Sequence, residues 1–448
     1  AWGPAPQPLR GSPPGTASGN VVGICLIDDF SDQVGTITPA QVEAFCNQIG
    51  YTAFGNNGSV RDYYHDVSGG VLNYTQFVPT AYHRASQPKS YYMDPAIPWG
   101  QRARELVVEA LDALDATGFD FSQYDSDGNG RIDAINLFYA GYSNTVWSEG
   151  LWPGSGGLSY YADGVYAERC QWSDMGASLS IGTYCHENGH MLMHWPDLYD
   201  YDYDSAGVGR FCLMANYGNA ANPVQPCAYL KLAAGWANVT ELAGVVAGAA
   251  VPAAGNIVYR IAHPTRTREY YLIENRQRTG RDASLPDHGL AIWHIDEDGS
   301  NDWNEMTTER HYLVTLVQAD GRWDLENDRN QGDSTDLWAA PTYTRCTPQT
   351  NPSPFWWDGA PTHLYISDIS ASAATMYFNF STSIWVDFGY VGTEEGTFVR
   401  PYNTLFEGVS VVEHFGTIKV RAGSSPETLT ISKPMTIVAL EGHATIGP

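Results

Sequence analysis

Lysine is scarce in this chain, and basic residues as a whole are few. Four of the 24 basic residues are lysine, whereas 50 residues are acidic, and the formal net charge at pH 7 is −26. A surface this acidic repels the phosphates of nucleic acids and the headgroups of anionic lipids. We therefore expect neither a nucleic acid nor an anionic lipid surface among its partners.

Long apolar runs are also absent. The sequence has no stretch of about 18 or more apolar residues, so no membrane-spanning segment is predicted. The chain opens at Ala1 without a methionine or a charged and then apolar leader. We expect that a secretory signal has already been removed or omitted.

Cysteine is sparse, and its seven copies are an odd number, so at least one cannot pair within the chain. Cys170, Cys185, Cys212 and Cys227 fall around one predicted helix, and disulfides among them would suit an extracellular protein. The alternative is that cysteines such as Cys25 and Cys185 are small buried hydrophobic residues. The sequence leaves both interpretations open.

The chain contains one HExxH pattern, formed by His186, Glu187 and His190. At about 3.6 residues per turn, the two histidines share one helix face and can reach the same zinc ion. Glu187 then lies beside the metal, where it can take a proton from a water molecule. An apolar stripe predicts a helix over residues 179–193, with Ser178 as its N-cap. The pattern indicates a zinc peptidase.

A third zinc ligand is expected just after this helix. Pro196 ends the helix, and Asp197 follows it with a carboxylate. His194 is the alternative ligand. It lies eight positions beyond His186, roughly 12 Å along a straight helix, which is too far for both histidines to bind one ion. This geometry favours Asp197 and leaves His194 as a residue of the cleft.

A D-x-D-x-N-G-x-x-D stretch predicts a structural calcium site. Spaced oxygen ligands can wrap a hard cation, and Gly130 allows the sharp turn between them. Position twelve of the loop is Asn136 instead of the usual glutamate, and the residues after it read as a strand, so a full EF-hand is not expected. The predicted calcium ligands are Asp125, Asp127, Asn129, the carbonyl group of Arg131, and Asp133.

Two further acidic clusters are ambiguous. One consists of Asp197, Asp200, Asp202 and Asp204, and the other of Asp320, Asp324, Glu326 and Asp328. For the first cluster a second cation is the alternative, and a solvated acidic loop is the favoured interpretation. A calcium site within the second cluster is a hypothesis only.

Length and composition predict several domains with real cores, because 448 residues are too many for one compact domain and 43% are hydrophobic. Residues 1–19, rich in Pro, Gly and Ala, are expected to form an extended arm. Residues 20–237 mix helical and strand patterns, and the strand-rich residues 238–382 predict a mostly β, sandwich-like domain. Residues 383–448 resemble the opening turns of a parallel β-helix. The overall class is α+β.

The expected elements follow from apolar periodicity. Helices are predicted at 39–48, 60–65, 101–114, 179–193 and 227–236, and strands at 21–27, 71–78 and 134–140. Further strands are predicted at 270–273, 290–295, 311–317, 374–380, 416–420, 428–431 and 435–439.

From the HExxH motif outward, the chain resembles the immune-inhibitor-A-type secreted metallopeptidases. The family motif is approximately HExGHxLGxPDLYD, and this chain reads HENGHMLMHWPDLYD from His186 to Asp200. Further similar stretches are spread over most of residues 20–382. They are GSVRDYYHDVSGGVLNYTQFV (58–78), YDSDGNGRIDAINLFYAGY (124–142), GRFCLMANYG (209–218) and YYLIENRQRTGRDASLPDHGLAIWHIDE (270–297).

This resemblance implies a secreted, extracellular, metzincin-like zinc endopeptidase that is made as a precursor with a propeptide and acts on polypeptides. We expect it to be a monomer. Met214 would be the methionine below the metal, and Tyr217 is a candidate for hydrogen bonding to a developing oxyanion. One departure concerns Asp197. Six residues separate it from His190 where the family has five, so one residue must be looped out. The alternative function is a catalytically silent, calcium-stabilised binding or adhesive protein of the cell surface.

Overall fold

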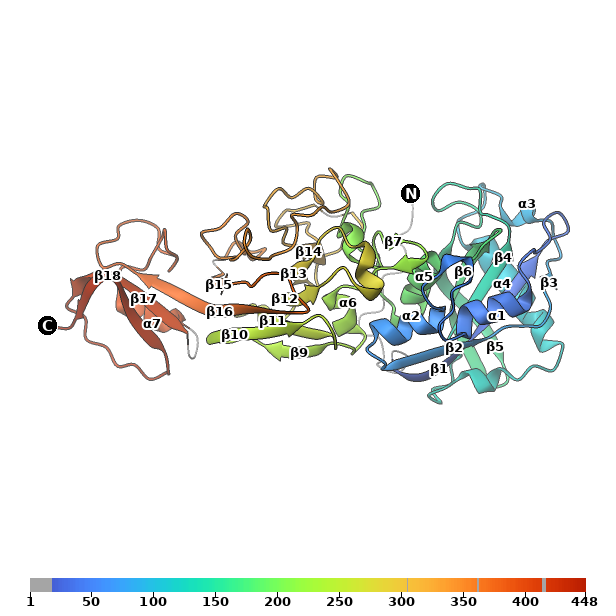
Figure 1. Cartoon of the computed structure of the whole chain (residues 1–448), viewed down its shortest axis with the longest axis horizontal. Helices are drawn as coiled ribbons and strands as arrows, with labels where there is room; N and C mark the ends of the chain where they lie inside the picture. The colour runs from blue at the N-terminus through green and yellow to red at the C-terminus, as the bar shows by residue number, and fades with distance from the viewer. Residues whose placement is uncertain (1–17, 304, 361, 413–415) are drawn as a thin grey trace. The chain divides into compact units, whose positions relative to one another are not determined.

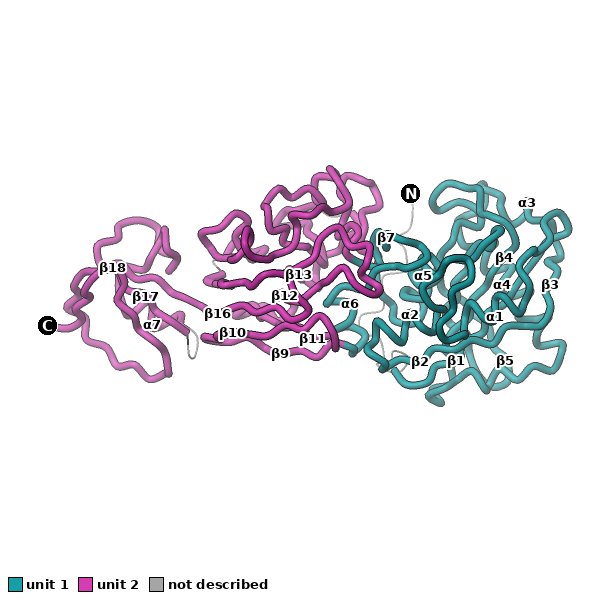
Figure 2. The backbone as a smooth tube through the Cα atoms, viewed as in Figure 1, with its two compact units in different colours: residues 1–197, 212–236 teal, residues 198–211, 237–448 magenta. Residues whose placement is uncertain are grey.

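The structure, a computed structural model, describes residues 18–303, 305–360, 362–412 and 416–448. The predicted arm, residues 1–19, lies outside the described residues except for its last two. The chain forms two compact units (Figure 2). Unit 1 comprises the chain up to Asp197 together with Cys212–Trp236, and unit 2 comprises Leu198–Phe211 and Ala237–Pro448. The short segment 198–211 thus interrupts unit 1 in sequence and belongs to unit 2 in space.

A six-stranded sheet forms the centre of unit 1 (Figure 1). Its order is β2-β1-β4-β6-β5, and β3 pairs with β1. All pairs are parallel except β5 with β6, so the edge strand β5 is antiparallel. The strands are β1 (Gly19–Asp29), β2 (Leu72–Phe77), β3 (His83–Arg84), β4 (Ile135–Ala140), β5 (Gly154–Ala162) and β6 (Val165–Met175).

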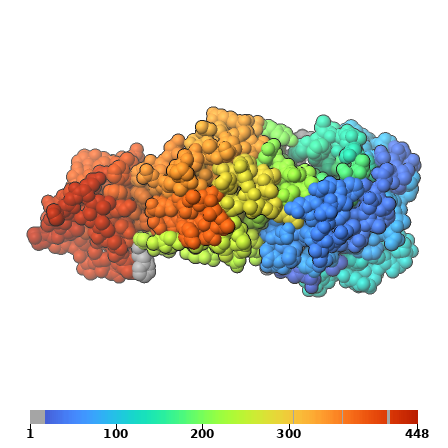
Figure 3. Space-filling view, viewed as in Figure 1, coloured from blue at the N-terminus to red at the C-terminus, as the bar shows by residue number. Residues whose placement is uncertain are grey.

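Helices cover both faces of this sheet. Ile24 and Leu26 of β1 pack into a core with α4, whereas Cys25 lies beside Cys46 of α1 on the other face. Burial on both faces explains why β1 is a continuous apolar run. The N-terminal residues drawn in blue, α1 and α2 among them, form much of the visible side of unit 1 (Figure 3).

The helices and short elements of unit 1 are α1 (Pro39–Asn47), α2 (Val60–Val67), α3 (Lys89–Tyr92), α4 (Gln101–Asp115), α5 (Ile181–Met193), α6 (Ala228–Ala233), the hairpin β7 (Gly218–Asn219) and β8 (Asn222–Pro223), and 3₁₀ turns at Ala53–Gly55 and Phe121–Tyr124. Local signals start the first two helices, because Thr38 and Ser59 each form a capping box. No helix in the described part of the chain is long and apolar enough to cross a membrane.

Most elements predicted for this part of the chain are confirmed to within a few residues. Helices α1, α2 and α4 and strands β1, β2 and β4 lie where apolar periodicity placed them. The predicted helix at 227–236 is too long, because α6 ends at Ala233. Strands β5 and β6 were not predicted. The glycines at the start of β5 lower the strand propensity of its sequence. Hydrogen bonding to β6 stabilises the strand despite this low propensity.

Unit 2 is built on two five-stranded sheets. The first has the order β14-β13-β12-β11-β9, and the second has the order β10-β16-β17-β18 with β15 beside β16. Ile273 of β12 and Phe378 of β16 belong to one apolar core, so the two sheets share that core. The strands are β9 (Asn238–Glu241), β10 (Val245–Pro252), β11 (Ile257–Ala262), β12 (Glu269–Arg276), β13 (Gly289–Asp296), β14 (Val314–Leu316), β15 (Leu364–Ser367) and β16 (Thr375–Val386), with 3₁₀ turns at Gly209–Phe211 and Gly280–Ser284.

The C-terminal strands run parallel to one another. Strand β16 pairs with β17 (Thr417–Ser425), which pairs with β18 (Thr436–Ile446), and α7 (Leu405–Val411) precedes β17. Parallel pairing of successive strands is what the opening turns of a β-helix require. The strand predicted at 428–431 is wrong, because these residues form no strand.

All seven cysteines lie in the described residues and are buried thiols. No two of them lie at disulfide distance, so the disulfides expected around α5 are not formed in this structure. Burial raises the pKa of Cys170 to about 12, which keeps that thiol protonated and unreactive. The alternative interpretation, buried cysteines acting as small hydrophobic residues, describes them better.

Gly23 of β1 gives room to a tyrosine that joins the sheet to α5. The Tyr74 hydroxyl donates to Asn188 Oδ1 of α5 at 3.0 Å, and a Cβ added at Gly23 would lie only 2.8 Å from that hydroxyl. We expect Gly23→Ala to lower the free energy of unfolding by about 1–3 kcal/mol in urea titrations, through overpacking. Gly157→Ala is the control, because its nearest neighbouring atom would be 4.0 Å away. Equal stability of the two variants would contradict this account.

Candidate metal centre

Helix α5, which carries the HExxH residues, packs against β5 and β6. It begins at Ile181, two residues later than predicted, and the predicted cap Ser178 is wrong. The first two N–H groups are satisfied by tertiary contacts instead. Ile181 donates to Asn56 Oδ1 at 3.1 Å, and Gly182 donates to the carbonyl oxygen of Ala220 at 2.7 Å. Sequence reasoning missed Asn56 because no local pattern marks a cap that comes from a distant loop.

The structure brings His186, His190 and Asp197 together. The Nε2 atoms of the histidines lie 3.2 Å from each other. Asp197 Oδ1 lies 3.0 Å from His186 Nε2 and 3.2 Å from His190 Nε2. His186, Glu187 and Asp197 are each at most 8% exposed, so this group is desolvated.

These spacings fit a tetrahedral zinc ion. Zn–N bonds of about 2.0–2.1 Å at tetrahedral angles place ligand atoms roughly 3.3 Å apart. The three observed distances are 3.0–3.2 Å. Two imidazoles and one carboxylate are a donor set that zinc accepts, and three protein ligands leave one position for water or substrate.

Backbone carbonyl groups orient both imidazole rings. His186 Nδ1 lies 3.0 Å from the carbonyl oxygen of Leu213, and His190 Nδ1 lies 2.6 Å from that of Trp195. A carbonyl oxygen can only accept, so each Nδ1 carries a hydrogen and each Nε2 faces the shared centre, where it offers a lone pair to a cation when it is unprotonated. No motif predicted these two carbonyl groups, because backbone atoms have no sequence signature.

The turn after α5 brings Asp197 back to the histidines. His194 follows the last helical residue with φ +54°, a left-handed conformation that reverses the chain. His194 is therefore the looped-out residue that the spacing of the motif requires. It is not among the side chains whose ligand atoms converge at this centre, whereas Asp197 is.

Met214 and Tyr217 contact α5 at different turns of the helix. A Cβ added at Gly189 would lie 2.7 Å from Met214 Sδ, so this buried methionine packs against the helix between the two histidines. The Tyr217 hydroxyl lies 2.9 Å from Thr183 Oγ1 in the first turn of the helix. Met214 therefore contacts the part of the helix that carries the two histidines, whereas Tyr217 contacts its first turn.

Electrostatics in this buried group are set by Asp197. Burial lowers the pKa of His186, but the carboxylate of Asp197 outweighs it and raises the pKa to about 9. The pKa of His190 is also raised, because Asp197 outweighs the opposing effect of burial. Burial opposes ionisation of Asp197 too, yet the two histidines hold its pKa well below the ordinary range. Burial raises the pKa of Glu187, as a proton-transferring carboxylate needs.

The predicted calcium loop brings its three aspartates together. Asp125, Asp127 and Asp133 each offer an oxygen within 4.8 Å of the others. Gly130, at φ +83°, donates its N–H to Asp125 Oδ2 at 2.8 Å. The Asn129 side chain donates to Asp127 Oδ2 at 2.9 Å, which keeps it in the cluster.

The other two loop positions behave differently. Arg131 turns its guanidinium to Glu168 at 2.9 Å, so only its carbonyl group remains as a candidate ligand. Asn136 lies in β4, where its side chain donates to the Tyr74 hydroxyl at 2.9 Å, and it takes no part in the loop. A strand follows the loop, as predicted, in place of the second helix of an EF-hand.

Two more acidic groups converge in unit 2. Asp200, Asp202 and Asp204 do so as a short run. The second predicted cluster differs from the one in the structure. The carboxylate of Asp320 lies close to those of Asp333 and Asp336. The predicted partners were Asp324, Glu326 and Asp328. Asp333 and Asp336 lie more than ten positions beyond Asp320, too far for a spacing pattern to reveal them.

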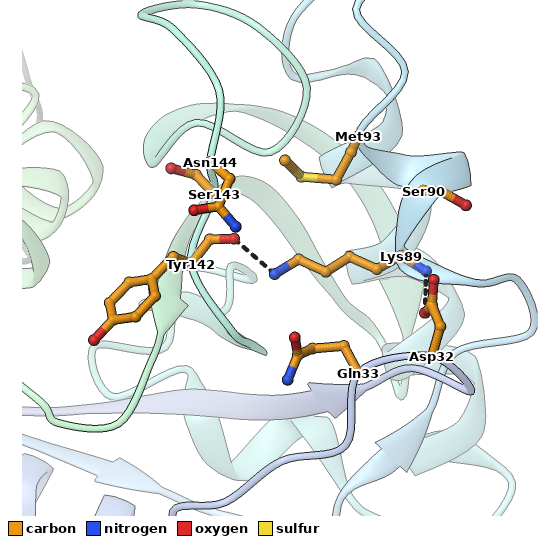
Figure 4. Close-up of a pocket in the computed structure, with 8 residues that line it drawn as sticks. All are labelled: Asp32, Gln33, Lys89, Ser90, Met93, Tyr142, Ser143 and Asn144. Atoms are coloured by element: carbon orange, nitrogen blue, oxygen red, sulfur yellow. Dashed lines mark hydrogen bonds between the residues drawn. The ribbon is translucent and has the colours of Figure 1, made fainter.

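A shallow pocket of about 240 Å³ in unit 1 is lined by Lys89 and Tyr142, among others (Figure 4). Lys89 Nζ donates to the carbonyl oxygens of Ala140 at 2.8 Å and Tyr142 at 2.7 Å. Burial lowers the pKa of Lys89 to about 8. None of the candidate metal ligands lines this pocket, and the hydrogen bonds of Lys89 serve to hold the chain where β4 ends.

No protein-family model matches this chain, and a search among curated proteins found no match either. A functional assignment therefore depends on the side chains that the fold brings together and on their chemistry.

The metal-free protein should lose stability as the pH rises above neutrality. The pKa of His186 is higher in the folded state, so its contribution is full below about pH 6.5 and is lost as the pH rises through about 9. We expect the free energy of unfolding to fall by up to roughly 3 kcal/mol between pH 6.5 and 9.5 in urea titrations after chelation. In Asp197→Asn this fall should largely disappear. The same pH dependence in both proteins would contradict the assigned cause.

Proposed function

We propose that this chain is a secreted zinc-dependent endopeptidase of the immune-inhibitor-A type, with a metzincin-like catalytic domain in unit 1. One observation carries the proposal. His186 Nε2, His190 Nε2 and Asp197 Oδ1 lie 3.0–3.2 Å from one another, with buried Glu187 next to the first histidine. A structural zinc site would not need a neighbouring base, so Glu187 favours catalysis over metal storage.

Zinc held by His186, His190 and Asp197 would polarise the scissile carbonyl group and acidify water at this centre. Glu187 would accept the proton from the attacking water and then deliver it to the leaving amine. Its raised pKa suits both directions of transfer. Tyr217 would support the oxyanion from its place beside the first turn of α5.

The edge strand β5 supports a polypeptide substrate. It contacts α5, and it is paired only with β6 among the described strands of the sheet. An edge strand presents unpaired N–H and C=O groups that an extended peptide can join as a further strand. A peptide bound in this way is held along its backbone, as an endopeptidase requires.

We further propose that the Asp125–Asp133 loop binds a structural calcium ion. The Ser126 hydroxyl accepts a hydrogen bond from the Val22 N–H at 3.2 Å, and Asp133 Oδ2 lies 3.4 Å from the same nitrogen. The ion would therefore fix the loop to the central strand β1 and stabilise the sheet that supports α5.

Glu187→Gln should abolish peptide hydrolysis without removing the metal. We expect the kcat for casein cleavage to fall by about 10³-fold, within the range for loss of a general base, while the zinc content stays at one ion per chain. Glu43→Gln, an exposed change in α1, is the control and should keep full activity. If the purified wild-type protein binds zinc but cleaves neither casein nor gelatin, the silent binding protein becomes the better interpretation.

The third ligand can be tested by a matched pair of substitutions. Asp197→Asn should weaken zinc binding by roughly 100-fold or more, measured by competition with a chromophoric chelator. His194→Asn should leave the affinity nearly unchanged, because asparagine tolerates the left-handed conformation of that residue. The reverse order of the two effects would make His194 the ligand.

A further inference from the structure

We propose that unit 2 binds a structural calcium ion between Asp320, Asp333 and Asp336. This site does not depend on the proposed peptidase activity. The three residues each offer one carboxylate oxygen, and these oxygens lie within 4.8 Å of one another. Asp320 follows strand β14, and the other two lie in the loop that leads to Leu337.

The site is partly buried, since Asp320 and Asp333 are half-buried residues and Asp336 is fully buried. Asp336 is 1% exposed, and the side chain of Asp320 is 5% exposed. A buried carboxylate is expensive unless it is paired, protonated or bound to a metal. Asp336 Oδ2 accepts the N–H of Asp333 at 2.6 Å, but Oδ1 has no hydrogen-bond partner. A buried oxygen left without a partner beside two other carboxylates is a place for a cation.

Among the described residues, arginine pairs with only one member of the cluster. Arg322 Nε lies 3.4 Å from Asp320, but its side chain is 62% exposed, and Arg329 pairs with Asp324 instead. Within the described residues, no ion pair to Asp333 or Asp336 is found. The negative charge of these two carboxylates can therefore be neutralised only by protons or by an added cation.

The pKa values of the buried acidic groups agree with this excess of negative charge. Burial raises the pKa of Asp336 to about 7, and the charges of Asp333 and Asp320 act in the same direction. Burial also raises the pKa of Glu326 to about 8, with further contributions from Asp336 and Asp324. A divalent cation would stabilise the ionised carboxylates that the metal-free cluster disfavours.

The ligand chemistry selects calcium. All donors are oxygens, which suits a hard cation and disfavours zinc. Two Ca–O bonds of 2.3–2.6 Å span at most about 5 Å, which accommodates oxygens within 4.8 Å of one another. The Thr335 hydroxyl oxygen, 2.8 Å from Asp320 Oδ2 and 2.6 Å from Asp333 Oδ1, is a fourth oxygen at the site. Irregular loops supply these ligands, whereas magnesium demands a nearly ideal octahedron.

The ion would also stabilise the segment that follows Asp197 in the chain. Ala206 donates its N–H to the carbonyl oxygen of Leu325 at 2.8 Å, and Arg210 donates to that of Gln331 at 2.9 Å. Both acceptors belong to the loop between Asp320 and Asp333. Calcium in unit 2 would thus order residues 198–211, which leave the candidate zinc ligand and return to Cys212.

The experiment counts bound calcium in the full-length chain carrying Glu187→Ala, so that no proteolysis interferes. After chelation, equilibrium dialysis against calcium should give one ion fewer in Asp336→Asn than in the parent. Hydrogen exchange of residues 318–336 should slow on calcium addition in the parent and stay unchanged in Asp336→Asn. At 100 times the dissociation constant, calcium should raise the unfolding midpoint of unit 2 by roughly 5–10 °C.

Two controls make the outcome decisive. Asp328→Asn removes the same charge from an exposed residue of the same loop, at φ +46°, where asparagine is tolerated, and should keep the ion. Asp125→Asn should lose a different ion while residues 318–336 keep their calcium protection. Equal calcium counts in Asp336→Asn and Asp328→Asn would overturn the site. Equal protection by magnesium at the same concentration would overturn the assignment to calcium.

Discussion

The candidate metal centre depends on holding two imidazoles and one carboxylate about 3 Å apart in a desolvated space. To bind a cation between them, both rings must point Nε2 toward the shared centre. The carbonyl groups of Leu213 and Trp195 impose that orientation, because each lies against the Nδ1 atom of one ring. The helix fixes the spacing of the rings, and two other chain segments fix their rotation. The geometry is therefore preorganised by backbone atoms.

The turn at His194 is the second constraint. Had α5 continued straight, residue 197 would lie roughly 10 Å along the axis from residue 190. The left-handed conformation at His194 instead returns the chain, so that Asp197 reaches both histidines. A side chain in this conformation costs more than glycine would, and the surrounding contacts must offset that cost.

Local patterns in the sequence predicted what depends on local spacing. The two histidines one helical turn apart, the strand β1 and the helices α1, α2 and α4 all follow from periodicity. The features that the sequence did not predict depend on residues far apart in the chain. Asn56 replaces a cap, β5 becomes a strand through pairing with β6, and Asp320 meets Asp333 and Asp336 across a loop. The positive φ of His194 was hidden for another reason, since histidine at that position gives no turn signal.

The scarcity of lysine connects the acidic composition to the proposed ions. Of the four lysines, the buried Lys89 donates its ammonium hydrogens to two backbone carbonyl groups. Some buried acids pair with arginine, as Asp282 does with Arg276 at 2.7 Å. The carboxylates of Asp125, Asp127 and Asp133 lie close together instead, and so do those of Asp320, Asp333 and Asp336. A divalent cation bound within either cluster would balance its charge. Calcium is abundant outside cells, where modules with dissociation constants of about 10⁻⁴–10⁻³ M are saturated or nearly so. A chain that balances buried charge in this way is stable where calcium is supplied and weakened where it is withdrawn.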